Sequence, residues 1–196
     1  MGKFTMLNCE HFWTGSFFPF LILPNIICFP FLDSTNTYAK TNLETLQHGD
    51  VIVADSQTAG RGQKGHHWRS DVIGNIYASI ILKPLNVKPD ELPMLTHDLA
   101  RAIIITLADY DVVATMKWPN DVMVEGKKIA GILAEAVTQG QQVKGVVLGF
   151  GVNLALPQEI VETIDQPATS LNLLLGKVVD RYTFLGRVIA LSLIHI

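Results

Sequence analysis

A glycine-rich stretch, QTAGRGQKGHHW (57–68), lies between two segments that have the pattern of β-strands. VIVAD (51–55) precedes it, and NIYASIILKP (75–84) follows it. A dinucleotide-binding turn needs a helix after its glycines, so that the helix N-terminus meets the pyrophosphate. Here a strand pattern follows instead, and no acidic residue for a ribose hydroxyl lies about twenty positions further on. The G-x-G-x-x-G spacing of this stretch therefore does not indicate a dinucleotide-binding fold.

Two other phosphate-binding patterns also fail on this stretch. Gly60 and Gly65 have the separation of the P-loop glycines, but His66 stands where that loop requires lysine. A kinase glycine loop is excluded because the VAIK, HRD and DFG motifs are missing from the sequence. Two interpretations remain open. In the first, the backbone amides together with Arg61 and Lys64 bind a phosphate-bearing ligand. In the second, the stretch is a surface loop whose charges have no function.

The apolar patterns along the chain predict an α+β fold. We expect helices from Asp33 or Ser34 to about Gln47, over 92–110 and over 181–194. We expect strands over 51–55, 75–84, 112–118 and 143–156, and a hairpin formed by 122–124 and 129–137. Helices near the ends with adjacent strands between them predict a largely antiparallel mixed sheet flanked by helices.

The run SFFPFLILPNIICFPFL (16–32) is almost entirely apolar. A membrane-spanning helix needs about 20 apolar residues, whereas this run is shorter and is interrupted by Pro19, Pro24 and Pro30. It also lacks the small-residue cleavage site of a signal peptide. We therefore expect no membrane segment. We expect a lead-in to a buried strand near Cys28–Leu32, with residues 1–25 outside a domain that occupies residues 26–196.

The net charge and the cysteine content indicate which kinds of partner and which cellular compartment to expect. The formal net charge is −3 and no basic tract is present, whereas binding to duplex nucleic acid needs clustered lysine and arginine. Cys9 and Cys28 form neither a CxxC motif nor a zinc-binding spacing. This cysteine content fits a reducing cytoplasm.

A second polar cluster follows a predicted strand, where KWPND (117–121) leads into GKKIAGILAE (126–135). Asn120 and Asp121 lie in a turn from which their side chains can reach a metal ion or a phosphate. Lys128 stands at the start of an apolar strand, from which its ammonium can enter a pocket; the alternative is a hairpin with solvated lysines. DSTN (33–36), at a helix start, adds a third cluster, and a helix N-terminus attracts carboxylates and phosphates.

Taken together, these segments resemble biotin–protein ligases. The matching motifs are DSTNTYA (33–39), ADSQTAGRGQKGHHW (54–68), GNIYAS (74–79), KWPNDVMVEGKKIAGILAE (117–135) and GVNLAL (151–156), in the family's order and spacing. The resemblance implies a catalytic domain with a fold like that of class II aminoacyl-tRNA synthetases. It also implies an ATP- and Mg²⁺-dependent activation of biotin to biotinyl-5′-adenylate. Biotin then passes to a lysine of a biotin carboxyl carrier protein domain.

The resemblance also assigns roles to particular residues. It makes Lys128 the catalytic lysine between the biotin carboxylate and the α-phosphate, and it places Arg61 in a loop that folds over the adenylate. The implied biotin contacts are Ser34, Thr35, Asn36, Gln57, Arg61, Gly62, Gln63 and Lys128. The implied ATP contacts are Arg61, Lys64, Trp68, Asn120, Asp121, Lys128 and Asn153, with Trp68 as a wall for the adenine and Asp121 as a Mg²⁺ ligand.

Three departures from the family pattern qualify these expectations. Gln63 stands where the family commonly has arginine, so the loop has one cation fewer. The sequence stops at Ile196 without the usual small C-terminal domain, so we expect a catalytic domain truncated at its C-terminus. No helix-turn-helix pattern precedes Asp33, which argues against a DNA-binding domain. Two alternatives stay open, a non-catalytic fragment that binds biotin or its adenylate and a lipoate–protein ligase. The oligomeric state is open between monomer and homodimer.

Overall fold

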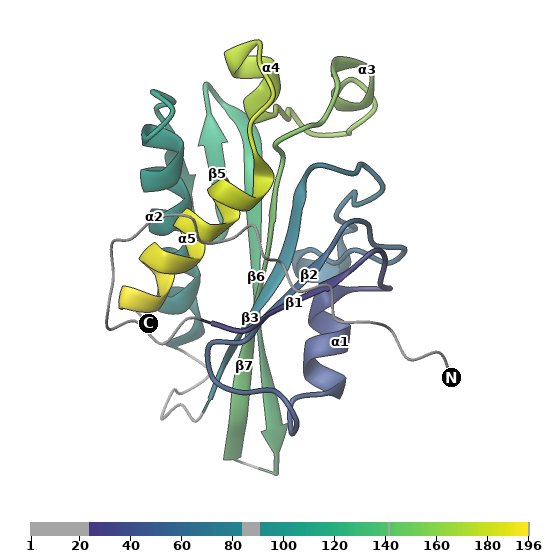
Figure 1. Cartoon of the computed structure of the whole chain (residues 1–196), viewed down its shortest axis with the longest axis vertical. Coiled ribbons are helices and arrows are strands. Elements are labelled where there is room, and N and C mark those ends of the chain that lie inside the picture. Colours follow the sequence, from purple (N-terminus) through teal and green to yellow (C-terminus); the bar gives the residue numbers. More distant parts are fainter. Residues whose placement is uncertain (1–23, 84–90, 141, 196) are drawn as a thin grey trace.

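A computed structural model of the chain describes residues 24–83, 91–140 and 142–195. A sheet forms the middle layer (Figure 1). Helices α2 (Leu92–Ala108) and α5 (Arg181–His195) cover one face of the sheet, and helix α1 (Thr35–Thr41) covers the other. The predicted α+β arrangement, a sheet flanked by helices, is therefore confirmed.

The described strands form one sheet in the order β1-β2-β3-β7-β6-β5-β4. Their bounds are β1 Ile26–Phe29, β2 Val51–Ala54, β3 Ile76–Leu82, β4 Thr115–Lys117, β5 Asp121–Val124, β6 Lys127–Gln139 and β7 Gln142–Val152. Only the pairing of β1 with β2 is parallel among these strands. The prediction of a largely antiparallel mixed sheet is confirmed.

Several predicted boundaries were wrong. Strand β1 begins two residues before the expected Cys28 and is half-buried at the edge of the sheet rather than buried. Helix α1 has the predicted N-cap, Ser34, but ends at Thr41 instead of continuing to Gln47. Asn42 closes it by donating its side-chain amide to the carbonyl of Tyr38 at 2.8 Å, as expected of a residue with poor helix propensity that hydrogen-bonds locally.

The two strands predicted over 112–118 and 143–156 are shorter than expected. Strand β4 covers only Thr115–Lys117. Strand β7 ends at Val152, and the carbonyls of the next two residues accept from another segment: Asn153 from the N–H of Leu171 (3.0 Å) and Leu154 from the N–H of Asn172 (2.9 Å). The sequence patterns missed two short helices, α3 (Gln158–Val161) and α4 (Leu171–Leu175).

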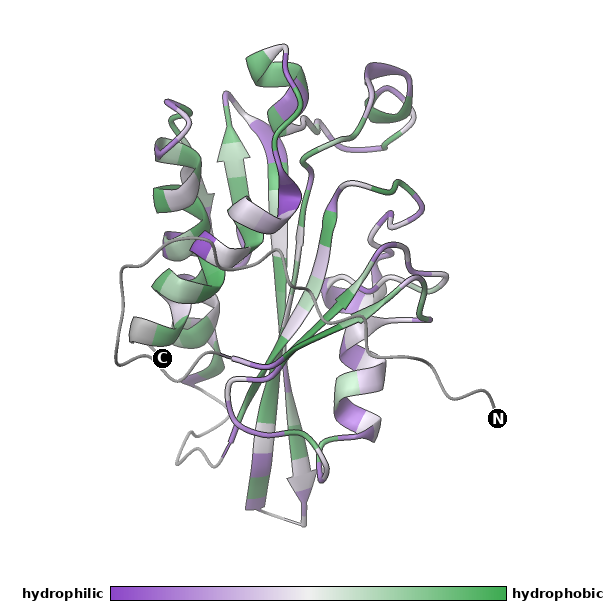
Figure 2. Ribbon diagram, in the orientation of Figure 1, coloured by the Kyte–Doolittle hydropathy of each residue, from purple (hydrophilic) through white to green (hydrophobic). Residues whose placement is uncertain are grey.

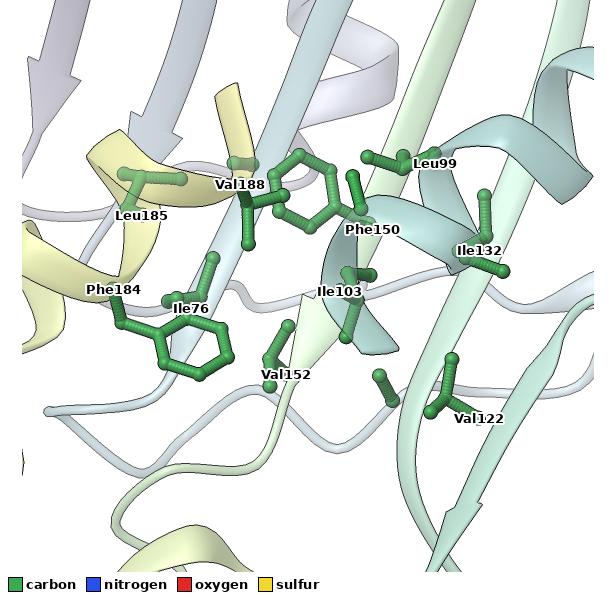
Figure 3. Packing of buried hydrophobic residues seen from close by; sticks show 14 of the residues in the cluster. Ile76, Leu99, Ile103, Val122, Ile132, Phe150, Val152, Phe184, Leu185 and Val188 are labelled. Carbon is green, nitrogen blue, oxygen red and sulfur yellow. The ribbon is translucent and has the colours of Figure 1, made fainter. Parts of the chain in front are cut away.

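Side chains on the central strands alternate between two different environments. Along β7, Leu148 and Phe150 belong to the large core beneath α2 and α5, while Val147 packs in a smaller cluster beneath α1. Figure 2 shows apolar residues along the central strands and on the covering helices. In Figure 3, Ile103 of α2 and Phe184 of α5 pack near Phe150 and Val152. The face beneath α2 and α5 therefore holds most of the apolar core, and the part of the other face outside the α1 cluster remains for polar groups.

The predicted apolar lead-in is described only from residue 24 onward, so residues 16–23 and the segment 1–25 lie largely outside the described residues. Within the described ranges, no helix combines the length and apolarity needed to cross a membrane.

We predict that Ile103→Ala lowers the free energy of unfolding by about 2–5 kcal/mol, because the residue is fully buried and the substitution leaves a cavity. Urea denaturation followed by circular dichroism measures the change. Ile73→Ala is the control, since Ile73 is 71% exposed and its loss should change stability by less than about 0.5 kcal/mol. An equal loss of unfolding free energy in the two variants would contradict the burial of Ile103 in the core.

Candidate active site

Glycines form a bare area on the α1 face of the sheet. Gly131 of β6 and Gly151 of β7 lie directly opposite each other in the ladder. The indole of Trp68 lies against both, since a Cβ atom added to Gly131 would lie 2.8 Å from its ring and one added to Gly151 would overlap it. At Gly149 an added Cβ would overlap the side chain of Asn36. Only glycine leaves room for these two side chains to lie on the sheet.

The stretch 57–68 forms a hairpin. Its backbone is closed by hydrogen bonds from Gly62 to the carbonyl of His66 (2.8 Å) and from Trp68 to the carbonyl of Gly60 (3.0 Å). A short 3-10 turn, Gln63–Gly65, makes the tip, and Gly65 has a positive φ of 79°. The glycines therefore permit a tight reversal that carries Trp68 onto the sheet, and no helix follows them.

A β-bulge aims Lys128 at the same face. Val122 pairs with Ala130, but Met123 pairs with Lys128, so that Ile129 is an extra residue on β6. Side chains alternate along a strand, and one extra residue reverses the alternation. Lys128 therefore shares a face with Gly131 instead of pointing into the core.

Lys128 meets two predicted site residues on this face. Its Nζ lies 2.7 Å from Oδ1 of Asp121 and 5.2 Å from the centre of the Trp68 ring. Both side chains of the ion pair are largely buried. The backbone of Lys128 also bonds to the segment after α3, through the carbonyl of Pro167 (2.8 Å) and the N–H of Thr169 (3.0 Å). The backbone that carries the ammonium is thus held by its own sheet and by a second segment distant in sequence.

Polar side chains at the start of α1 form a continuous network with the hairpin and the sheet. The Gln57 amide oxygen accepts from the backbone N–H of Thr35 at 2.8 Å and from its hydroxyl at 3.2 Å. Ser79 donates to Oδ1 of Asn36 at 2.6 Å and lies 2.8 Å from the Thr35 hydroxyl. Asn36 in turn donates to a carboxylate oxygen of Glu135 at 2.8 Å. These bonds fix the orientation of side chains that face the space above the glycines.

Glu135, Lys40 and Arg61 form a charged group beside this network. Nζ of Lys40 lies 2.6 Å and the Arg61 guanidinium 3.2 Å from the same Glu135 oxygen. Burial acts to raise the pKa of Glu135, but hydrogen bonds from Lys40 and Asn36, with the charges of Lys40 and Arg61, outweigh it and lower the pKa. Glu135 is therefore ionised at neutral pH.

A cavity of about 730 Å³ brings most of the predicted site residues together. Those lining it are Ser34, Thr35, Asn36, Gln57, Arg61, Gly62, Gln63, Lys64, Trp68, Asn120, Asp121 and Lys128. Asn153 is buried and does not line this cavity. The volume lies in the range of small-molecule sites, and the lining combines cations, amides and aromatic surface.

Other lining residues were not predicted as contacts. Lys117 and the exposed Trp118 belong to the KWPND motif, so their sequence neighbourhood was already conspicuous. Ile164, Asp165 and Gln166 come from the segment after α3, which no motif indicated. Arg69 donates to the hydroxyl of Thr163 at 2.9 Å and so links the end of the hairpin to this segment.

The residues around Asp121 fit a Mg²⁺ ion that a phosphate ligand helps to hold. Oδ1 of Asp121 is buried and makes no well-aligned hydrogen bond, although the Lys128 ammonium lies 2.7 Å away. Within the described ranges, no group of three or more His, Cys, Asp or Glu side chains could form a complete metal site. Mg²⁺ commonly binds through one or two carboxylates together with phosphate oxygens, and Asp121 can supply such a carboxylate.

Comparison with known proteins agrees with this geometry. The model of the Biotin/lipoate A/B protein ligase family matches residues 28–153. The bifunctional ligase/repressor BirA of Bacillus subtilis is 35% identical over 135 residues, covering 68% of this chain and 41% of that protein. The biotin–[acetyl-CoA-carboxylase] ligase of Paracoccus denitrificans is 34% identical over 167 residues, covering 78% of this chain and 65% of that protein.

A solved structure has the same fold. The biotin protein ligase of Aquifex aeolicus, in complex with biotin and ATP, superposes with a TM-score of 0.73 at 30% identity, covering 87% of this chain and 69% of that one. The chain belongs to the biotin/lipoate A/B protein ligase family. It spans about two fifths of the length of the Bacillus subtilis relative.

We predict that Gly151→Ala displaces the Trp68 indole, because the added methyl group overlaps it. The tryptophan emission should move to longer wavelength as the half-buried indole becomes more hydrated, and overpacking of this kind should cost about 1–3 kcal/mol of stability. In a Trp68→Phe background the same substitution should leave the emission of the remaining tryptophans unchanged. An emission maximum that stays in place when Trp68 is present would count against the packing of its indole on the sheet.

Proposed function

We propose that this domain activates biotin with ATP to biotinyl-5′-adenylate and transfers biotin to a lysine of a carrier protein. In the first step, a carboxylate oxygen of biotin attacks the α-phosphorus of ATP and pyrophosphate leaves. In the second step, the carrier amine attacks the acyl carbon and AMP leaves. The names of the relatives, and the biotin and ATP held by the Aquifex aeolicus protein, support this choice of substrates.

The observation that carries the proposal is the position of Lys128. Two anions, a carboxylate and a triphosphate, must come together in the first step, and their repulsion has to be offset. The side chain of Lys128 is largely buried beside the bare area formed by the glycines of β6 and β7. There a cation attracts an anion more strongly than it does in water. We assign the Lys128 ammonium the role of stabilising the charge that develops on the α-phosphate. In the free protein the carboxylate of Asp121, 2.7 Å away, balances the positive charge of the Lys128 ammonium.

Other residues at the cavity have supporting roles in this proposal. Arg61 and the hairpin 57–68 cover the activated intermediate and keep water from it. Thr35, Asn36 and Gln57, already held by hydrogen bonds, orient the biotin head and chain. A Mg²⁺ ion, when held by Asp121 and the phosphates, supplies further positive charge to the reacting oxygens.

The second substrate in the proposal is a biotin carboxyl carrier protein domain. The use of ATP and a cysteine content that fits a reducing compartment favour the cytoplasm as the place of reaction. The repressor role that the name of the Bacillus subtilis relative gives to that protein is not part of the proposal, because this sequence has a net charge of −3 and no basic tract that would favour binding to nucleic acid. The lipoate alternative has less support, since the Paracoccus denitrificans relative and the Aquifex aeolicus structure both carry biotin in their names.

The test is a single-turnover reaction with the purified chain, biotin, labelled ATP, Mg²⁺ and a biotin carrier domain. Lys128→Ala should lower the rate of adenylate formation by about 10²- to 10³-fold, the usual loss when one electrostatic donor to a transition state is removed. Lys127→Ala is the matched control, because its exposed side chain precedes Lys128 and lies outside the lining of the cavity. Its rate should stay within about twofold of the original.

The same reaction separates the competing hypotheses. Adenylate together with labelled carrier supports the complete proposal. Adenylate without carrier labelling limits the chain to the first step. Absence of adenylate from a folded chain that still binds biotin would overturn the enzymatic proposal and favour a binding module. Lipoate used in preference to biotin would overturn the substrate assignment.

We further predict that Gln63→Arg slows the release of biotinyl-5′-adenylate, because it adds a cation to a hairpin that lines the cavity. The position is partly exposed, so the gain should be no more than about fivefold. Release is measured by trapping free adenylate during its slow escape from the protein. Gln142→Arg, which adds the same charge at an exposed position of β7, should leave release unchanged. Faster release from Gln63→Arg would contradict the assigned role of the hairpin.

A further inference from the structure

Glu135 lies outside the cavity but its side chain bonds to two separate segments beside it, helix α1 and the glycine hairpin. It is on β6, two residues beyond Leu133, on the face that carries Gly131. One carboxylate oxygen receives Lys40 of α1 and Arg61 of the hairpin, and the other receives the amide of Asn36. Helix, hairpin and sheet therefore meet at one carboxylate, which is not among the residues that line the cavity.

The hairpin tip has few other attachments. In the described part of the chain, Arg61 makes the one ion pair between residues 60–67 and the rest of the protein. The backbone bonds of these residues, from Gly62 to His66 and from Trp68 to Gly60, close the hairpin on itself. The charge of Glu135 thus has a large share in holding the tip against the sheet.

The two cations on Glu135 differ in exposure. Lys40 is the closer partner, at 2.6 Å, with 27% of its side chain exposed. Arg61 lies at 3.2 Å with 47% exposed. Two cations share one carboxylate, so the group keeps a net positive charge next to the cavity. An exposed, shared ion pair of this kind is weak, and an anionic ligand can take over the Arg61 guanidinium without breaking the contact between Lys40 and Glu135.

We propose that Glu135 is a positioning residue: it holds Arg61, and through it the glycine hairpin, against the sheet until an anionic ligand replaces it as the partner of Arg61. The holding role depends only on the contacts of the free protein. The replacement by a ligand rests on the proposed function, in which the ligand is the adenylate.

The holding role is tested on the ligand-free chain by limited trypsin digestion. Lys64 is exposed at the hairpin tip, and cleavage there reports how often the tip opens. Glu135→Gln keeps the shape of the side chain and removes its charge. It should speed cleavage after Lys64 by about two- to fivefold, the range that a partly exposed ion pair supports. Cleavage after the exposed Lys177, in the turn after α4, should not change.

Lys40→Met is the matched control. It removes the stronger ion pair of Glu135 but leaves the carboxylate to Arg61, so cleavage after Lys64 should stay the same or slow down. Arg61→Met should speed this cleavage as much as Glu135→Gln does, and the double variant should be no faster than either single variant, because both remove one contact. Unchanged cleavage in Glu135→Gln, or equal acceleration in Lys40→Met, would overturn the proposal.

The ligand-dependent part is tested by the release of preformed biotinyl-5′-adenylate. Release from Glu135→Gln should be slower than from the original chain by no more than about fivefold, because no carboxylate then competes with the adenylate for Arg61. Lys40→Met keeps that carboxylate and should not slow release. Equal or faster release from Glu135→Gln would overturn the exchange of Arg61 between Glu135 and the ligand. If the original chain forms no adenylate, the proposed function fails, and the trypsin experiment still decides whether Glu135 holds the hairpin.

Discussion

The alternation of side chains along β6 and β7 is the constraint on which the site depends. One set of positions carries Leu148, Phe150 and their neighbours into the core beneath α2 and α5. The opposite set carries Gly131, Gly149 and Gly151, which leave the other face bare. A shift of one residue in register would exchange the two faces. Stability and ligand space are therefore set by the same ladder of hydrogen bonds.

A local break in that ladder supplies the central charge. Without the extra residue Ile129, the alternation would turn Lys128 toward the apolar core, where an unpaired ammonium is very costly. The bulge turns it to the glycine face, beside Asp121. The apolar side chain of Ile129 stays fully buried. The bulge therefore lets a strand with a buried apolar residue, Ile129, also place the charge of the neighbouring Lys128 in the cavity.

The hairpin 57–68 is attached in two different ways, and this difference matters for the proposed chemistry. Its base is tied by Gln57, which bonds to Thr35 and to the hydroxyl of Ser70. Its tip is tied by the weaker contact of Arg61 with Glu135. A base fixed by hydrogen bonds and a tip held by one replaceable ion pair are suited to a segment that opens to admit a ligand and then closes over it. The neighbouring amides and hydroxyls are already ordered by their mutual bonds, which reduces the entropy lost on binding.

The motifs in the sequence were sufficient to predict the family and the mixed, largely antiparallel sheet, and most of the residues that they singled out line one cavity. They succeeded because each motif combines polar residues with turn or strand signals that depend on local sequence. Boundaries were less well predicted. Helix α1 stops early at Asn42, and β7 stops at Val152, where the following carbonyls accept from the backbone of Leu171 and Asn172 instead of continuing the ladder. Neither event leaves a periodic signal in the sequence.

What the sequence determined by itself was the set of chemical groups: the glycines, the cations of the hairpin, and the lysine and aspartate of the KWPND–GKK segment. Only the tertiary structure decided how they meet. The bulge that aims Lys128, the contact of Glu135 with Arg61, and the wall formed by residues 164–166 all depend on pairing between segments distant in sequence. Such contacts are fixed by register and packing across the whole sheet, and no local pattern of residues encodes them.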